Sequence, residues 1–268
     1  MSTAPHTWPR LYLADDLRIE SEIILSPDHT HYLLHVLRAQ AGDSIRIFNG
    51  RDGEWRATLT QTPQKKKEGA ILSIREQRRP QSAEPDVWLC CAPIKRNHFD
   101  YMIQKATELG ASVIQPVLTS HTQVRESNVE RLRTIAIEAA EQAERLSVPE
   151  IREPVSLATL VKNWPKNRLP IICAEFGDAQ PAAQGLSSAL AQARTAAAIF
   201  TGPEGGFTTD ELALLHTLPE VLCLRLGCRI LRADTAALAA LSCWQALCGD
   251  WKTHQGDIRT PRDNGTAR

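Results

Sequence analysis

The chain has 268 residues, of which 31 are basic and 31 acidic, so its formal net charge is zero. A chain of this length has room for two ordinary domains or one large one. The balanced charge excludes a strong global field for a polyanionic partner, although a local basic patch would be enough to bind nucleic acid.

The chain has seven cysteines, an odd number that cannot all pair in disulfides within one chain. No two of them form a Cys-x-x-Cys motif, and most lie in apolar segments. This pattern indicates reduced core residues in a cytoplasmic protein. His31 and His35 have the spacing of two metal ligands, but no third ligand accompanies them, so we expect no metal site. No basic leader followed by an apolar stretch and no apolar run of about 18 residues is present, so we expect no membrane segment.

Residues 1–80 are predicted to form a small β-rich domain. A helix is predicted over residues 28–39, because an aspartate precedes apolar residues at helical spacing. The polar, proline-containing segment 76–86 is the predicted linker. Short apolar segments separated by turn signals predict strands at 10–14, 44–48, 54–59 and 70–74.

Residues 81–251 have a different pattern, in which predicted apolar strands alternate with predicted helices. This alternation predicts an α/β domain with a largely parallel sheet covered by helices on both faces. The tail, residues 252–268, has little to bury, and we expect it to be mobile. The predicted strands are 86–92, 112–118, 169–175, 195–201 and 220–226, and the predicted helices are 98–109, 127–145, 186–194, 208–217 and 235–250.

The first unusual loop, TGPEGGFTTDE (201–211), follows a predicted strand directly. Its glycines let the backbone approach a ligand closely, and Thr208 with Glu211 has the spacing of a capping box. The loop lacks the lysine of a P-loop and the spacing of a dinucleotide fingerprint, while Glu204 would repel phosphate. The ligand is therefore not expected to be a nucleotide phosphate.

The second unusual loop, RLGCRILRADTAAL (225–238), lies between the last predicted strand and the last helix. Asp234 or Thr235 has a residue type suited to cap that helix. In an open α/β sheet, ligands bind beyond the carboxyl ends of strands, so the two loops are predicted to form one pocket. Either loop alone is equally compatible with an ordinary strand-to-helix connection.

The paired motifs GPEGGF and LGCRILRADTA resemble the signature of the SPOUT, or α/β-knot, methyltransferases. Among these the sequence resembles the RsmE family, which methylates N3 of a uridine in 16S ribosomal RNA. The resemblance also includes RLYL (10–13) and residues 31–55, 103–119 and 138–151, and it covers about residues 8–250. It implies an N-terminal PUA-like β-barrel, a C-terminal domain with a deep trefoil knot, S-adenosylmethionine as cofactor, and a homodimer with active sites shared between subunits.

By this resemblance Arg232 is the candidate catalytic residue, because a fixed guanidinium stabilises the negative charge that develops on uracil. Asp234, where the family usually has glutamate, is interpreted as a helix cap or a general base, and Glu204 as a further catalytic candidate. The implied cofactor-binding residues are Thr201, Gly202, Pro203, Glu204, Gly205, Gly206, Leu226, Gly227, Ile230 and Leu231.

The implied partner is small-subunit ribosomal RNA or the assembled subunit. The predicted RNA contacts are Arg10, Arg38, Lys95, Arg96, His98, Arg125 and Arg145. The sequence departs from the family at Arg96-Asn97-His98, where Asp-Arg is frequent, and at Glu144 and Ser147, which stand in place of a glycine and a basic residue. Two alternatives stay open: methylation at another RNA position, such as a ribose 2′-OH, and a non-catalytic RNA-binding assembly factor.

Overall fold

The computed structural model describes residues 7–63, 68–124, 127–173, 179–191 and 196–252. The chain divides into two compact units. Unit 1 comprises Met1–Glu84, Ile103–Glu108 and Asn128–Ile151, and unit 2 comprises Pro85–Met102, Leu109–Ser127 and Arg152–Arg268. The domain division at residue 80 stays a prediction, and the expected mobile tail falls outside the described residues apart from Lys252.

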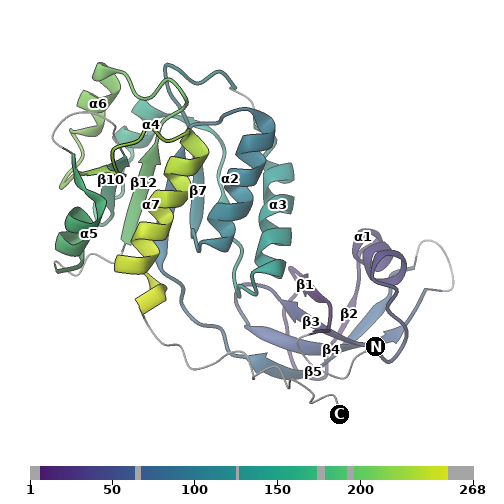
Figure 1. Cartoon of the computed structure of the whole chain (residues 1–268). Helices are drawn as coiled ribbons and strands as arrows, with labels where there is room; N and C mark the ends of the chain where they lie inside the picture. Colours follow the sequence, from purple (N-terminus) through teal and green to yellow (C-terminus); the bar gives the residue numbers. More distant parts are fainter. Residues whose placement is uncertain (1–6, 64–67, 125–126, 174–178, 192–195, 253–268) are drawn as a thin grey trace, which may run out of the picture. The chain divides into compact units, whose positions relative to one another are not determined.

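Unit 1 is built on a five-stranded sheet with the order β1-β3-β4-β5-β2 (Figure 1). β1 pairs with β3 in parallel, and the other neighbours are antiparallel. The predicted strands are present, and β2 is an addition that the sequence analysis missed. The strands are β1 (Arg10–Tyr12), β2 (Glu22–Ile24), β3 (Ser44–Phe48), β4 (Glu54–Gln61) and β5 (Ile71–Arg79).

The predicted linker 76–86 is wrong in its first residues. β5 continues to Arg79, because Glu76, Gln77 and Arg79 pair with Arg56, Trp55 and Glu54 of β4. Glu76 and Gln77 are exposed, whereas Arg79 is only partly exposed and its Nη1 donates to the Glu144 carbonyl at 3.0 Å. Polarity alone therefore did not distinguish a strand from a linker here.

The predicted helix 28–39 begins as an α-helix and continues as a wider π-helix. Ser26 caps α1 (Pro27–His31) by accepting a hydrogen bond from the His29 N–H, and η2 (Tyr32–Val36) follows at once. Leu33 is fully buried in the unit 1 core with Leu11, Ile45 and Leu72. Among the described residues no group of three potential metal ligands occurs, at His31 and His35 or elsewhere.

Helix α3 (Val129–Gln142) completes unit 1 together with β8 (Glu150–Ile151). The backbone N–H of Tyr12 in β1 donates to Glu141 Oε1 in α3 at 2.8 Å. The Arg10 Nη1 atom donates to the Ala140 carbonyl at 2.8 Å. The first strand of the chain is thus fastened to a helix that occurs more than a hundred residues later.

Unit 2 contains a parallel sheet with the order β11-β13-β10-β12-β6-β7, and β9 runs parallel beside β7 (Figure 1). The five predicted strands form its centre. The strands are β6 (Asp86–Cys91), β7 (Val113–Leu118), β9 (Val155–Ser156), β10 (Leu169–Cys173), β11 (Gln180–Pro181), β12 (Ala196–Thr201) and β13 (Leu222–Arg225).

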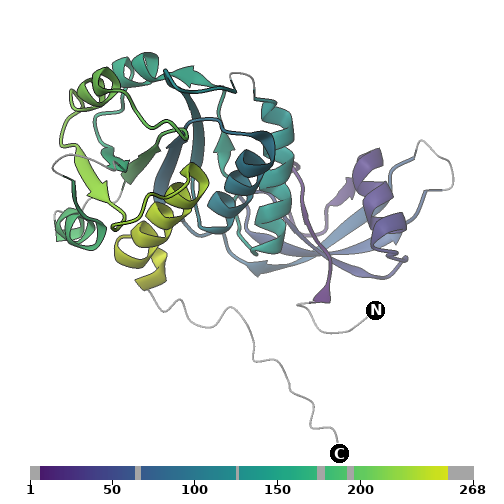
Figure 2. The same cartoon turned by 45° about the horizontal axis from the view of Figure 1, so that its top comes forward.

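Helices cover both faces of this sheet, as predicted. Phe200 and Ala198 of β12 face the core that contains α4 and α6, and the intervening Ile199 is fully buried on the opposite face, where α7 and α2 run side by side (Figure 2). α4 was not predicted. The helices are α2 (Arg96–Glu108), which contributes to both units, α4 (Leu157–Lys162), α5 (Ala182–Ala191), α6 (Thr209–Leu215) and α7 (Ala233–Leu247), followed by η3 (Asp250–Lys252).

No helix in the described part of the chain is long and apolar enough to cross a membrane. All seven cysteines are free thiols, as predicted, but the expectation of core positions is wrong for Cys228 and only partly met by the four half-buried cysteines. Cys90 and Cys91 are buried in β6, while Cys228 is exposed on the loop after β13.

Candidate active site

The first glycine-rich loop leaves β12 at Thr201 and returns to the chain's next helix, α6. Gly206 has a φ of +65°, a conformation that favours glycine, and its N–H donates to the Pro203 carbonyl at 2.9 Å. A Cβ atom on Gly202 would lie only 3.2 Å from the Gly206 backbone, whereas a Cβ on Gly206 would meet nothing within 4 Å. The loop is therefore tightly folded on itself but has open space beside Gly206.

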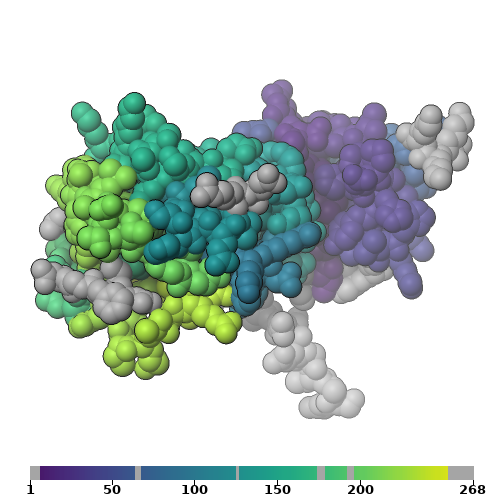
Figure 3. All heavy atoms as spheres, turned by 90° about the horizontal axis from the view of Figure 1, so that it is seen from above, coloured from purple at the N-terminus to yellow at the C-terminus, as the bar shows by residue number. Residues whose placement is uncertain are grey.

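The far end of this loop is fixed by the predicted capping box, which the structure confirms. Thr208 caps α6 by accepting from the Glu211 N–H at 3.2 Å, and Glu211 Oε2 accepts from the Thr208 N–H at 2.9 Å. Satisfying these N–H groups stabilises the start of a short helix. Figure 3 looks onto this region, where the green atoms around α6 lie at the surface.

Ser120 and His121, which follow β7, both form hydrogen bonds that hold the glycine-rich loop. The sequence analysis missed both residues. His121 Nδ1 lies 2.9 Å from the Gly205 carbonyl oxygen, so it donates a hydrogen bond there. The Ser120 N–H donates to Glu211 Oε1 at 2.7 Å. Their position just beyond the carboxyl end of a strand was the available signal, since that edge of an α/β sheet holds the ligand crevice.

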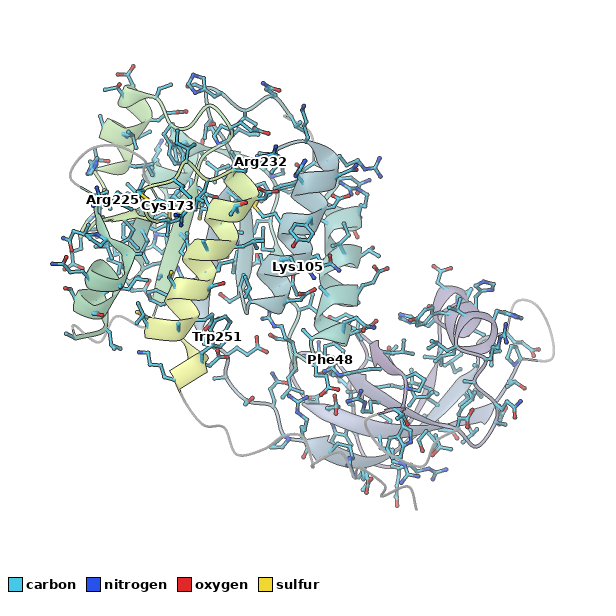
Figure 4. The ribbon with its side chains drawn as sticks, in the orientation of Figure 1. Phe48, Lys105, Cys173, Arg225, Arg232 and Trp251 are labelled. Carbon is cyan, nitrogen blue, oxygen red and sulfur yellow. The ribbon has the colours of Figure 1, made fainter. Side chains whose placement is uncertain are left out.

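The second loop connects β13 to α7. Gly227 has a φ of +107°, and the loop ends at Arg232, the N-cap residue of α7 (Figure 4). Ile230 is 80 % exposed, which is unusual for a large apolar side chain. The loop therefore offers an uncovered apolar surface next to a charged helix start.

The two loops meet at a cavity of about 290 Å³, lined by Ile94, Lys95, His98, Glu204, Arg232, Ala233 and Asp234. Its volume lies just below the usual range for small-molecule pockets, about 300 to 1,000 Å³. All three catalytic candidates, Arg232, Asp234 and Glu204, line it together with two of the predicted RNA contacts, Lys95 and His98. The lining carries both signs of charge.

Asp234 lies in the first turn of α7, and its side chain bonds to a histidine. Its Oδ2 atom is 3.0 Å from His98 Nδ1, and its Oδ1 accepts from the Thr235 N–H at 2.8 Å. Burial alone would raise the pKa of Asp234, but the hydrogen bonds from His98 and Thr235 outweigh it and lower that pKa. The predicted cap role is wrong in detail, because Arg232 is the N-cap residue and no side chain caps the helix there.

The loops suit a cofactor that is cationic and lacks phosphate. The Thr201 hydroxyl at the end of β12 is buried and has no hydrogen-bond partner among the described residues, so a polar ligand group could satisfy it after a side-chain rotation. Open space beside Gly206 and Gly227 leaves backbone accessible, and the exposed Ile230 offers an apolar contact. The Glu204 carboxylate in the cavity complements a positive charge rather than a phosphate.

Of the remaining predicted RNA contacts, two are exposed on the surface and one is not among the described residues. Arg96 is exposed at the start of α2, with its Nε 4.0 Å from Asp100 Oδ2. Arg38 is exposed after η2 with a φ of +56°. Arg125 lies outside the described residues.

Arg10 and Arg145 require a correction. Arg10 is 7 % exposed; its Nε donates to Glu54 Oε2 at 2.6 Å, and its other nitrogens donate to the Ala140 and Arg145 carbonyls. Arg145 is 8 % exposed and bonds Glu84 and the Thr107 carbonyl. Guanidinium groups buried in such a network stabilise unit 1 and are not available to phosphate.

Two family models match this chain. Residues 81–245 match an RNA methyltransferase domain, and residues 25–72 match an RNA methyltransferase PUA domain. The chain belongs to the RNA methyltransferase family. The fold agrees with this assignment, since the PUA match falls on the curled sheet of unit 1 and the methyltransferase match spans the parallel sheet.

Members of this family resemble the chain over most of its length. The ribosomal RNA small subunit methyltransferase E of Rickettsia conorii is 36 % identical, with 87 % of this chain and 93 % of the relative covered. The same-named protein of Synechocystis is 34 % identical, with 89 % and 77 % covered.

A solved structure with the same name, from Neisseria gonorrhoeae and bound to S-adenosyl methionine, is 28 % identical with a TM-score of 0.80. It covers 91 % of this chain and 99 % of its own. A putative methyltransferase from Legionella pneumophila, also in complex with this cofactor, is 27 % identical with a TM-score of 0.76, covering 91 % and 99 %.

Proposed function

We propose that this RNA methyltransferase transfers a methyl group from S-adenosylmethionine to N3 of one uridine in 16S ribosomal RNA, giving 3-methyluridine. The observation that carries the proposal is the cavity between the two loops, in which Arg232 and Asp234, at the start of α7, meet Lys95, His98 and Glu204. The names of the relatives at 34 to 36 % identity support small-subunit ribosomal RNA as substrate. The proposal includes a cytoplasmic location, a homodimer with sites shared between subunits, and a trefoil knot in the C-terminal domain.

The cofactor would be held by the two loops. Backbone groups from Thr201 to Gly206 and from Leu226 to Leu231 would bind its polar groups, with Ile230 and Leu231 against the adenine. When bound, S-adenosylmethionine supplies an electrophilic methyl group on a sulfonium centre. The Glu204 carboxylate would favour that positive charge, because opposite charges attract strongly in a site shielded from water.

Uridine N3 carries a proton and is a poor nucleophile until the proton leaves. As it leaves, negative charge spreads over N3 and the two adjacent carbonyl oxygens of uracil. The Arg232 guanidinium remains charged at any working pH and has planar donors, so it would stabilise these oxygens. Lys95 in the cavity and Arg96 on the surface would bind phosphate groups that flank the target nucleotide, and the exposed Arg38 of unit 1 would contact RNA elsewhere.

The decisive experiment measures transfer of labelled methyl groups to small ribosomal subunits and to free 16S RNA that lack this modification, followed by nucleoside analysis. Arg232→Ala is compared with Arg229→Ala, an exposed arginine of the same loop that does not line the cavity. We expect label in 3-methyluridine, a loss of about 10²- to 10³-fold for Arg232→Ala, and retained cofactor binding.

Each of the other possible outcomes would contradict a different part of the proposed function. Label in a 2′-O-methylated nucleoside would overturn the N3 assignment. Cofactor binding without any labelled RNA would contradict the substrate, and absence of cofactor binding would contradict the enzymatic function. Equal losses of methyl-transfer activity in Arg232→Ala and Arg229→Ala would contradict a specific catalytic role for Arg232.

A further inference from the structure

His98 and Asp234 form a pair at the wall of the cavity, although they are 136 positions apart in the chain. His98 lies in the first turn of α2 and Asp234 in the first turn of α7. Their side chains are joined by a contact of 3.0 Å between Nδ1 and Oδ2, and both line the cavity with Arg232. The pairing therefore places an imidazole beside the proposed uracil site.

The direction of this hydrogen bond follows from the state of Asp234. The pKa of Asp234 is lowered, since the hydrogen bonds from His98 and Thr235 outweigh the effect of burial, so the carboxylate is ionised and only accepts. His98 Nδ1 must then carry the hydrogen. In the neutral imidazole this leaves Nε2 with a free lone pair, which is the atom that accepts protons.

The other charged groups of the cavity are less suited to accept a proton. Arg232 and Lys95 are cations. Both oxygens of Asp234 already accept hydrogen bonds, from His98 and from Thr235, and its lowered pKa makes it a weak base. Glu204 is exposed on the glycine loop and is the one remaining competitor among the described lining residues.

We propose that His98 is the general base that removes the N3 proton of the target uridine, and that Asp234 is the positioning residue that holds its tautomer and orientation. This inference rests on the proposed function. The N3–H bond breaks and its proton passes to His98 Nε2, while the electron pair left on N3 forms the new bond to the methyl carbon. The carbon–sulfur bond breaks with its pair kept by sulfur, and the imidazolium later releases the proton to water.

The first test needs no catalysis. Nitrogen NMR of the ligand-free protein identifies which ring nitrogen of each histidine carries hydrogen. We expect the Nδ1–H form for His98 in the native protein and a mixture of both forms in Asp234→Asn. A native His98 that carries hydrogen on Nε2 would overturn the proposal, because that tautomer has no acceptor facing away from Asp234.

The second test measures single-turnover methyl transfer between about pH 5 and 8. His98→Asn keeps a donor near the Nδ1 position and loses the basic nitrogen, and His216→Asn, an exposed histidine after α6, is the matched control. We expect a rate that rises with pH and then levels for the native protein and the control. His98→Asn should be about 10² to 10⁴ times slower near neutral pH, with a rate that keeps rising.

An RNA substrate with 5-fluorouridine at the target position distinguishes a role of His98 as general base from a purely structural role. Fluorine makes the N3 proton easier to lose, so the relative loss in His98→Asn should shrink, whereas a folding or docking defect would persist. His98→Gln and cofactor affinity provide a check on the fold. A native pH profile in His98→Asn, or a larger KM with an unchanged single-turnover rate, would overturn the proposal.

Two further outcomes distinguish the claims. Loss of the pH dependence in Glu204→Gln but not in His98→Asn would assign the proton to Glu204 instead. If the native protein forms no 3-methyluridine, the proposed function and the role of His98 are both wrong. If the native protein forms 3-methyluridine and His98→Asn has the same single-turnover rate at every pH, only the role assigned to His98 is wrong.

Discussion

Glu211 at the start of α6 accepts a hydrogen bond from the backbone N–H of Ser120, with 2.7 Å between nitrogen and Oε1. Its second oxygen accepts from the Thr208 N–H at 2.9 Å. One carboxylate thus connects the loop after β7 to the glycine-rich loop after β12. The first turn of α6 therefore fixes the end of the glycine-rich loop and ties it to the loop after β7.

Glu211→Gln should destabilise the protein by about 1 kcal/mol at neutral pH, as expected for a weakened helix cap. Burial alone would raise the pKa of Glu211, but the hydrogen bonds from Thr208 and Ser120 lower it overall. A depressed pKa stabilises the fold above the ordinary glutamate value, near 4.3, and this stabilisation is lost as the pH falls through the native pKa. Urea unfolding at several pH values should show the variant and the native protein converging in acid. A stability difference that stays constant at all pH values would contradict this prediction.

Gly206→Ala should weaken cofactor binding with only a modest loss of stability. The cost of the positive φ is about 1 kcal/mol, because the new Cβ meets no atom within 4 Å. Gly42→Ala is the matched control, since Gly42 also has a positive φ and an open Cβ position but lies in unit 1. Calorimetric titration with S-adenosylmethionine should show weaker binding for Gly206→Ala alone; equal affinities in both variants would show that the open space is not used.

Arg10→Ala should lower the free energy of unfolding by about 3 to 5 kcal/mol, because it removes the nearest cation from a buried carboxylate. Arg10 and Glu54 are each 3 % exposed in their side chains, and the Nε–Oε2 distance is 2.6 Å. Arg18→Ala, at a pair with Asp16 that is mostly exposed, should cost at most about 1 kcal/mol. Guanidinium denaturation provides the comparison, and similar small effects at both sites would contradict the structural role assigned to Arg10.

Cys228 should react first when the native protein is treated with iodoacetamide. It is exposed on the loop after β13, whereas burial raises the pKa of Cys91 to about 12 and that of Cys90 still further. Because the thiolate is the reactive form, the β6 pair should react only after unfolding. Mass spectrometry of the peptides should also show slower modification of Cys228 with S-adenosylmethionine present, and unchanged modification of Cys223; no protection would argue against a cofactor role for this loop.

The sequence predicted the sheet of unit 2 well because its strands are apolar on both faces and alternate with helices. It failed for α4 and β2, which are short and carry little periodicity of their own. It also failed for the end of β5, where cross-strand pairing with β4 decides the conformation of a polar segment. These elements depend on their neighbours in space more than on their own residues.

The site was predictable where residues lie on one of the two loops, and not where separate segments meet. The motifs identified Arg232, Asp234 and Glu204, and the structure brings them to one cavity. The partnership of His98 with Asp234 required the fold, because these residues lie 136 positions apart. For His121 the position after a predicted strand indicated the correct edge of the sheet, but its contact with Gly205 also required the fold. Arg10 and Arg145 show the converse, since a basic residue that suggests RNA binding can be fully engaged inside the protein.

One departure from the family pattern has a structural explanation. Glu144, which stands where a glycine is expected, has a φ of +58°. That conformation favours glycine and costs other residues about 1 kcal/mol or more. The Glu144 carboxylate accepts a hydrogen bond from Arg46 at 3.0 Å, a favourable contact that glycine could not make.

The attachment of α3 to the first strand sets an order for biosynthesis. When residues up to Glu84 have left the ribosome, the Arg10 guanidinium already has Glu54 as a neighbour, but the carbonyls of Ala140 and Arg145 have not been synthesised. All five strands of the unit 1 sheet are available by then, but β1 lacks its contacts with α3 and Arg145 while β6 and β7 of the parallel sheet emerge. Unit 1 reaches its final form only when translation has passed Ile151, so the nascent chain completes its first unit after it has begun its second.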